Sequence, residues 1–352
     1  MELPSYFIDF LQNIRPTDSD RQAFKAAHTD LRQLLLQDER LSPVIVTTFL
    51  QGSYRRATAL HAYQGHRPDV DVVVVTRLSP NEYRATQALN CFKPFLRDHY
   101  PNAWGTNERS LCITVNGVDL DLVVTSAPAH ADVGILSGVA SEDGTAEEDE
   151  GTSTSDNALW KLEPLLIPDR QAEQWQSTHP LAQLAWTRAK NRETNGHFVN
   201  VVKAIKWFKR ITAGMPKHPR SYPLEHLVGA CCPDGIKDVA TGIVQTLEAM
   251  VAKYGGYAQA GQVPVLPNHG IPIQNVFARV PAEDFRAFME RIQGAARLAR
   301  RALDSQDMAE SAELWRELLG DEFPSGGSSS GSRGGFSPRT SASVIGAGRF
   351  GR

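Results

Sequence analysis

The feature that most constrains this chain is an almost unbroken run of valines between Val70 and Val75. A strand with one face in water alternates polar and apolar side chains, whereas a continuous apolar run is typical of a strand buried on both faces. Other elements must then cover each face, and helical patterns precede and follow the run. The sequence therefore predicts an α+β fold: a mixed sheet with flanking helices, followed by a mainly helical second half.

Two carboxylates, Asp69 and Asp71, stand at the head of this strand. Residues i and i+2 of a strand point to the same face, so the two side chains project together. Two like charges side by side are costly unless a cation lies between them. Oxygen ligands with an incomplete protein shell suit Mg²⁺, which keeps waters and takes substrate phosphates as its remaining ligands, and Mn²⁺ is the alternative ion.

A second pair of carboxylates, Asp119 and Asp121, lies in the second strand of a hairpin that is predicted around Asn116-Gly117. A site for two metal ions needs about three carboxylates that converge from neighbouring strands. Asp121 is our choice for the third ligand, because an apolar run follows it directly, as one follows Asp71. The alternative, Asp119, stays open because it lies on the same face.

A turn of small residues, Gly52-Ser53, follows a β-branched run over 43–50 that predicts another strand. Glycine lets the backbone approach a phosphate closely, and serine adds a hydroxyl donor. A helix N-terminus after the turn would add amide donors and the positive end of its dipole. Gln51 flanks the turn and is a further candidate for nucleotide binding.

In this order, the Gly-Ser turn, the paired carboxylates and the third carboxylate resemble the DNA polymerase β-like nucleotidyltransferase superfamily. Within it, the segments QGSYRRAT, DVDVVVV and VDLDLVV resemble the CD-NTases, the cGAS/DncV-like nucleotidyltransferases of bacterial anti-phage (CBASS) systems. The resemblance implies a polymerase β-like catalytic core and a mainly helical second lobe, with a central cleft between them. It also implies that Asp69, Asp71 and Asp121 are the catalytic residues and the ligands of two Mg²⁺ ions.

The activity that the resemblance implies is the joining of ATP and other nucleoside triphosphates into a cyclic di- or trinucleotide messenger, with release of pyrophosphate. In the family, a lysine on a helix after the core binds the donor triphosphate. A serine–aromatic pair then meets the triphosphate and stacks on the donor base. Lys206, followed 15 residues later by Ser221 and Tyr222, matches this pattern, and Lys203 lies one turn earlier. A lysine suits phosphate and a tyrosine ring suits a purine face. Without the resemblance, we would interpret the lysines as a solvated helix face and Tyr222 as a core residue.

The residue patterns, with the resemblance, divide the chain into three predicted segments. Residues 1–160 form the catalytic core, residues 161–322 form the helical lobe that completes the nucleotide cleft, and residues 323–352 form a disordered Gly/Ser/Arg-rich tail. An acidic stretch over 141–156 predicts a mobile loop. The segment 263–277 is expected to pack under the active-site cleft.

Composition weighs against some alternatives. The net charge of −3 and the pI of about 6.4 give no general basic field for nucleic acid, and sequence-specific nucleic-acid binding has no strong sign. A nucleotidyltransferase that tails RNA or modifies a small molecule such as an antibiotic remains an alternative. A third hypothesis is a non-enzymatic scaffold or toxin–antitoxin component, but degenerate members lose carboxylates that are present here. The histidines and cysteines show no zinc-ligand spacing.

The expected compartment is the cytoplasm. The four cysteines form no CxxC pair, and no apolar run reaches the length of a membrane span, so no membrane partner is expected. The tail carries apolar islands in polar sequence, which are typical of segments that dock on a protein. A regulatory protein that binds the enzyme or its C-terminal tail is therefore a further expected partner.

Overall fold

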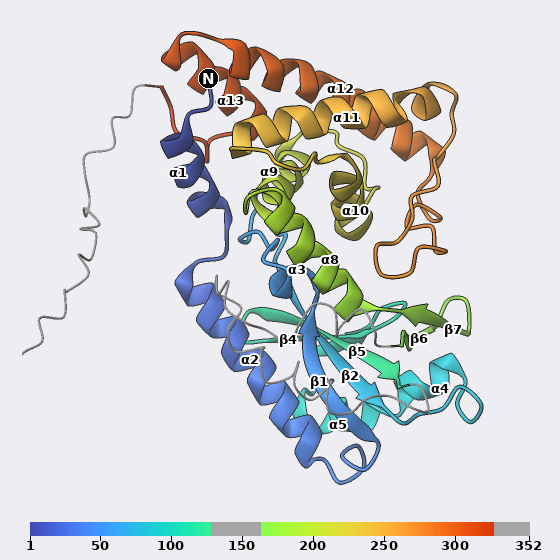
Figure 1. Cartoon of the computed structure of the whole chain (residues 1–352). Helices are drawn as coiled ribbons and strands as arrows, with labels where there is room; N and C mark the ends of the chain where they lie inside the picture. Colours follow the sequence, from blue (N-terminus) through green and yellow to red (C-terminus); the bar gives the residue numbers. More distant parts are fainter. Residues whose placement is uncertain (128–162, 327–352) are drawn as a thin grey trace, which may run out of the picture.

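The computed structural model describes residues 1–127 and 163–326, and Figure 1 shows a sheet below a group of helices. The loop predicted at 141–156 and all but the start of the predicted tail lie outside the described residues. The strands are β1 (Ile45–Gln51), β2 (Asp69–Thr76), β3 (Trp104–Thr106), β4 (Leu111–Val115), β5 (Val118–Ser126), β6 (Leu165–Asp169) and β7 (Gln174–Thr178). The helices are α1 (Pro4–Ile14), α2 (Asp18–Gln37), α3 (Gly52–Arg55), α4 (Ala85–Asn90), α5 (Lys93–His99), α8 (Pro180–Glu193), α9 (Phe198–Ile211), α10 (Ser221–Cys231), α11 (Val239–Gln259), α12 (Ala282–Asp304) and α13 (Met308–Leu319).

The strands form one mixed sheet in the order β1-β2-β5-β4-β3, with β6 paired to β5 and β7 paired to β6. β2 and β5 run parallel, whereas β1 pairs with β2 and β4 pairs with β5 in the antiparallel sense. The hairpin of β4 and β5 turns at Asn116 and Gly117, whose φ angles of 50° and 79° are both positive, as a type I′ turn requires. The predicted hairpin is confirmed.

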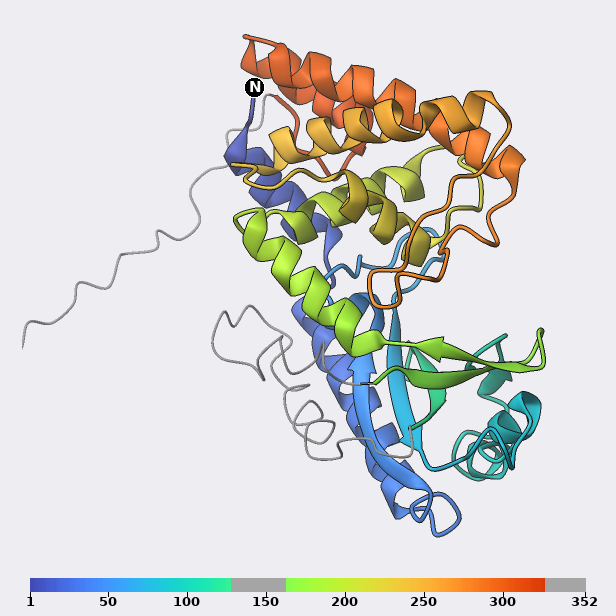
Figure 2. The same ribbon diagram turned by 45° about the vertical axis from the view of Figure 1, so that its right-hand side comes forward.

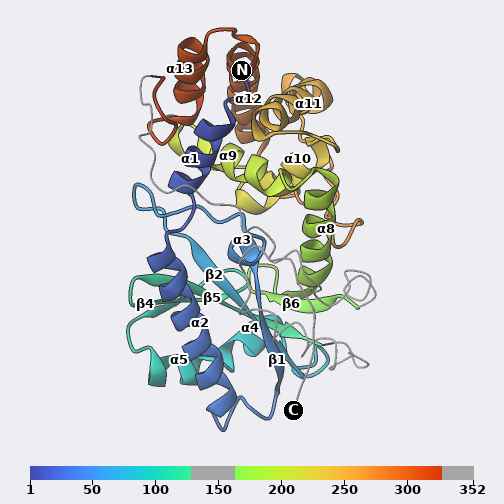
Figure 3. The same cartoon turned by 60° about the vertical axis from the view of Figure 1, so that its left-hand side comes forward.

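Both faces of β2 are buried, as the valine run predicts. Val72 and Val74 belong to the core that α2, α4 and α5 form on one side of the sheet. Val73 and Val75 belong to a smaller cluster with Leu181 of α8 on the other side. Figure 3 shows α2 along one face of the sheet, and Figure 2 shows α8 descending from the group of helices to the sheet. The predicted fold class, a mixed sheet with flanking helices and a mainly helical second half, is confirmed.

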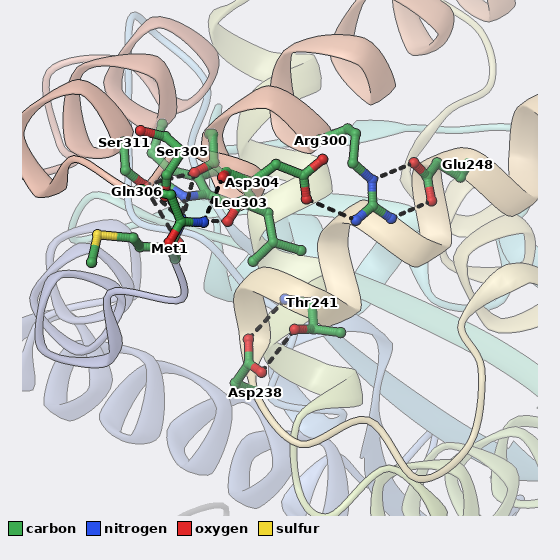
Figure 4. A network of polar contacts seen from close by, with 12 residues as sticks. Met1, Asp238, Thr241, Glu248, Arg300, Leu303, Asp304, Ser305, Gln306 and Ser311 are labelled. Atoms are coloured by element: carbon green, nitrogen blue, oxygen red, sulfur yellow. Dashed lines mark hydrogen bonds and ion pairs between the residues drawn. The ribbon is translucent and has the colours of Figure 1, made fainter.

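The N-terminal helix α1 packs with the helices of the second half, not with the sheet. In Figure 4, the backbone nitrogen of Met1 donates to the carbonyl of Leu303 at 2.5 Å, at the end of α12. One turn earlier, Arg300 of α12 binds Glu248 of α11 through two hydrogen bonds of 2.8 Å. Although α1 lies within the predicted catalytic core (residues 1–160), it packs as one more helix of the mainly helical second half.

The residue pattern over 80–100 is typical of one helix and the pattern over 54–60 of a short helix, and the structure differs from both expectations. In place of the one helix expected over 80–100, the structure has two short helices, α4 and α5. Pro94 cannot continue α4, but it is favoured in the first turn of a helix, where it lies in α5. The helix expected over 54–60 ends at Arg55, and Ala57 has a left-handed φ of 56° that no α-helix continues through. The sequence reasoning missed α1 and the β6–β7 hairpin. Within the described part of the chain, no helix has both the length and the apolar character to cross a bilayer.

Candidate active site

Four carboxylates gather on one face of two parallel strands. The register of β2 and β5 sets Asp69 beside Asp119 and Asp71 beside Asp121. Because each pair is spaced i and i+2, all four side chains leave the same face of the sheet, the face that α8 covers further along. The convergence that the sequence predicts is therefore built by strand register.

Burial and mutual repulsion act on these carboxylates. Burial, followed by the charges of Asp69 and Asp121, raises the pKa of Asp71 to about 8. Burial and then Asp69 raise the pKa of Asp121 to about 6, although the Asn107 amide donates to it at 3.0 Å. Asp119 accepts a hydrogen bond of 2.7 Å from Thr114. The repulsion at Asp71 comes from Asp69 and Asp121, which favours Asp121 over Asp119 as the third member of the group.

The donor set fits a hard divalent cation. A cation at this face would offset the burial and the mutual repulsion that raise the pKa of both Asp71 and Asp121. All the donors are carboxylate oxygens, the ligand type that Mg²⁺ and Mn²⁺ prefer. Among the described residues, no three acidic, histidine or cysteine side chains are already drawn together as a ligand set.

The Gly52-Ser53 turn lies directly against Asp71. Gln51, the last residue of β1, pairs with Asp71 in the sheet. Gly52 follows it with a φ of 76°, and a Cβ at this position would lie 1.7 Å from a carboxylate oxygen of Asp71. Only glycine allows this backbone to pass so close to the carboxylate. Ser53 follows Gly52 in the short helix α3, so α3 begins next to the carboxylates. The predicted small-residue turn therefore lies beside them.

A buried ion triad joins the turn to the helical half. Arg56 donates to Glu225 through two hydrogen bonds of 3.0 and 3.1 Å, and Lys206 donates to the same carboxylate at 2.9 Å. Thr58 completes the group, because its carbonyl accepts from Lys206 at 2.9 Å and its hydroxyl donates to Glu225 at 3.0 Å. We call Arg56, Lys206 and Glu225 the ion triad. Burial acts to raise the pKa of Glu225, but Arg56 and Lys206 hold it down to about 2.

Among the residues predicted to bind the donor nucleotide, Lys206 is itself a member of the ion triad. Ser221 and Tyr222 begin α10, one turn before Glu225 on the same helix. Tyr222 keeps 39% of its surface exposed, whereas Lys203 on α9 is buried. Arg56 acts on both sides of the site. Burial raises the pKa of Tyr222 and the pKa of Asp71, and the positive charge of Arg56 lowers both.

Sequence reasoning missed Glu225, although a signal for it was present. An acid four residues after Ser221 lies on the same face of a helix, one turn further on. An acid on the face that meets the predicted lysine helix has to pair with a cation if it is buried. The pairing with Lys206 follows from that rule, but the choice of Arg56 as the second cation depends on the tertiary fold.

Comparisons with known proteins identify the family. The Second Messenger Oligonucleotide or Dinucleotide Synthetase (SMODS) domain matches residues 1–129. A relative from Salmonella paratyphi B, named a probable cyclic AMP-AMP-GMP nucleotide synthase, is 41% identical over 97% of both chains. A cyclic AMP-AMP-GMP synthase from Enterobacter hormaechei subsp. hoffmannii is 39% identical over 99% of this chain and 100% of its own.

The chain is a CD-NTase. It is therefore an enzyme, a nucleotidyltransferase of the cyclic oligonucleotide synthase type. Solved structures agree on the fold. CdnC of Escherichia coli MS115-1 with ATP has a TM-score of 0.66 and 15% identity, over 92% of this CD-NTase and 100% of that chain. Vibrio cholerae DncV, a cyclic AMP-GMP synthase, has a TM-score of 0.65 and 11% identity, over 92% and 97% of the two chains. CdnC is also solved in a CdnC:HORMA-deltaN complex.

Proposed function

We propose that this CD-NTase joins ATP and GTP into a cyclic oligonucleotide that contains AMP and GMP and acts as a messenger in anti-phage defence. Two relatives that match along nearly their whole length and are named for cyclic AMP-AMP-GMP support the choice of bases. The structural observation that carries the proposal is the register of β2 and β5, which brings Asp69, Asp71 and Asp121 onto one face.

Asp69, Asp71 and Asp121 are the residues that would hold two Mg²⁺ ions. Bound ions supply Lewis-acid chemistry, which activates the attacking hydroxyl of the acceptor and neutralises charge on the leaving pyrophosphate. Gly52 lets the turn lie close against Asp71, and the Ser53 hydroxyl would donate to a phosphate of the bound donor. The protein's own contribution is to hold the acceptor hydroxyl and the donor α-phosphate in line.

The ion triad would bind the donor triphosphate. Arg56 and Lys206 carry two positive charges against the one negative charge of Glu225, so one positive charge is left for an anion. Ser221 would donate to the same phosphates, and Tyr222 would stack on the donor base. Lys203, one turn earlier on α9, and Gln51, beside Asp71, are the further proposed contacts.

The test is a mass spectrum of the products made from all four nucleoside triphosphates with Mg²⁺, with and without added RNA. We expect a cyclic product that contains AMP and GMP, together with pyrophosphate. The double variant Asp69→Asn, Asp71→Asn should release pyrophosphate at least about 1,000-fold more slowly, because several kcal/mol of metal stabilisation are lost. Elongated RNA without a cyclic product would contradict the proposed reaction. Undiminished synthesis by the folded double variant would contradict the metal assignment.

A further inference from the structure

A column of aromatic rings leads from Tyr222 into the protein. The Tyr222 ring lies 4.5 Å from the His226 ring at a tilt of 50°. His226 stacks on His269 at 4.1 Å and 19°, and His269 stacks on Trp186 at 3.4 Å and 14°. We call these four residues the ring column. Only Tyr222, at its outer end, belongs to the nucleotide site proposed above.

The ring column draws on three separate segments. Tyr222 and His226 lie on α10, Trp186 lies on α8, and His269 lies on the connection between α11 and α12. Gly229 of α10 leaves space for the column, because a Cβ there would lie 2.4 Å from the Trp186 ring and 2.8 Å from the His269 ring. A side chain at this position would split the stack, so the close approach of α8 and the connection to α10 depends on a glycine.

Both imidazoles of the ring column are neutral near pH 7. Burial lowers the pKa of His226 to about 4 and the pKa of His269 to about 2. Two imidazolium ions at 4.1 Å would repel each other, whereas neutral rings stack favourably. The column therefore behaves as a stack of uncharged rings, and its two histidines are unsuited to proton transfer at this pH.

The connection that carries His269 is held at both ends of its turn. Asn268 accepts hydrogen bonds from the backbone of Gly270 and Ile271 and donates to the Gln274 side chain at 3.1 Å. Gln274 in turn donates to the carbonyl of Ser177 on β7 at 2.8 Å. Figure 2 shows this connection, drawn in orange, reaching from the helices toward the β6–β7 hairpin. His269 is thereby fixed relative to the sheet as well as to the helices.

We propose that the ring column positions Tyr222 for stacking on the donor base, with His269 as a positioning residue on the far side of His226. This inference rests on the proposed function, in which Tyr222 contacts the base. Tyr222 is supported by His226 yet keeps 39% of its surface exposed, so a purine can meet its open side. A ring that is already held in place loses little freedom when the ligand binds, which strengthens binding.

The test compares His269→Ala with His269→Phe in steady-state synthesis and in the binding of a non-hydrolysable ATP analogue. We expect the alanine variant to raise KM for ATP about three- to tenfold and to leave kcat within about twofold, the size of effect typical of one aromatic pair. The phenylalanine variant should restore KM, because it restores the stack without the ring nitrogens. Ile273→Ala, on the same connection but 95% exposed, is the matched control and should behave as the wild type.

A double-mutant cycle separates positioning from a general structural effect. If His269 acts through Tyr222, His269→Ala should add little to the loss of affinity caused by Tyr222→Ala. Additive losses, or a wild-type KM in a folded His269→Ala variant, would overturn the inference. If the alanine variant does not fold, a raised KM in the folded phenylalanine variant overturns it instead. Failure of the proposed function looks different, because the wild type itself would then make no cyclic product.

Discussion

The site contains two groups of buried charges that differ in balance. At the carboxylate face, burial and the like charges of Asp69 and Asp121 raise the pKa of Asp71 to about 8. In the ion triad, Glu225 is surrounded by two cations, and its pKa is lowered to about 2. Both lie beside the same turn after β1. In the first group the carboxylates repel one another, whereas in the second both cations are paired with Glu225.

This difference in charge balance indicates a different role for each group. An unbalanced group costs folding free energy and gains most from the ion that completes it, as expected of a catalytic centre. The ion triad holds two cations in a fixed geometry around one carboxylate, with one positive charge in excess, as expected of a frame that binds an anion. Arg56 belongs to the triad but also lowers the pKa of Asp71, so it couples the two groups.

The largest expected effect is at the carboxylate face. Asp121→Asn should slow pyrophosphate release about 1,000-fold, because it removes a charge from the group that would hold the ions. Asp119→Asn is the matched control two residues away on the same strand, and it should cost less than about tenfold. Its carboxylate already accepts a hydrogen bond from Thr114. A reversed order of the two variants would make Asp119 the third ligand.

The ion triad should respond in stability. Glu225→Gln leaves Arg56 and Lys206 buried without a countercharge and should lower the free energy of unfolding by about 3–5 kcal/mol at pH 7. The matched control is Glu248→Gln, whose bridge to Arg300 is about 40% exposed and should contribute about 0–1 kcal/mol. Urea unfolding followed by circular dichroism measures both. Equal losses would mean that the triad contributes no more than a surface pair.

The pH dependence of the same measurement has a defined sign. The folded-state pKa of Glu225 is depressed from 4.5 to about 2, so its contribution is fully present above pH 4.5. The contribution should fall as the pH decreases from 4.5 toward 2. The difference in stability between the wild type and Glu225→Gln should therefore shrink over this window, and a constant difference would contradict the assignment of the pairing.

The carboxylate face could be predicted from the sequence because local rules determine it. Alternation in a strand places Asp69 with Asp71, and the Asn116-Gly117 turn fixes the hairpin that carries Asp121. The parallel pairing of β2 with β5 adds the register, and no local signal specifies it. The position of α1 and the pairing of Glu225 with Arg56 depend on contacts between residues far apart in the chain, so residue spacing alone does not reveal them. His269 was missed for the same reason, since its stack joins three segments.

The smallest expected effect sharpens the role of the turn between the two groups. Gly52→Ala should destabilise the protein by about 1–3 kcal/mol more than Gly65→Ala. The two glycines have similar positive φ angles, 76° and 82°, but a Cβ at Gly52 meets Asp71 at 1.7 Å whereas a Cβ at Gly65 meets nothing within 4 Å. Backbone strain is thus common to both variants, and the difference in unfolding free energy isolates the contact with Asp71. Equal destabilisation would show that Gly52 is needed only for its backbone angle. It would also show that the Asp71 side chain can move aside for a Cβ at this position.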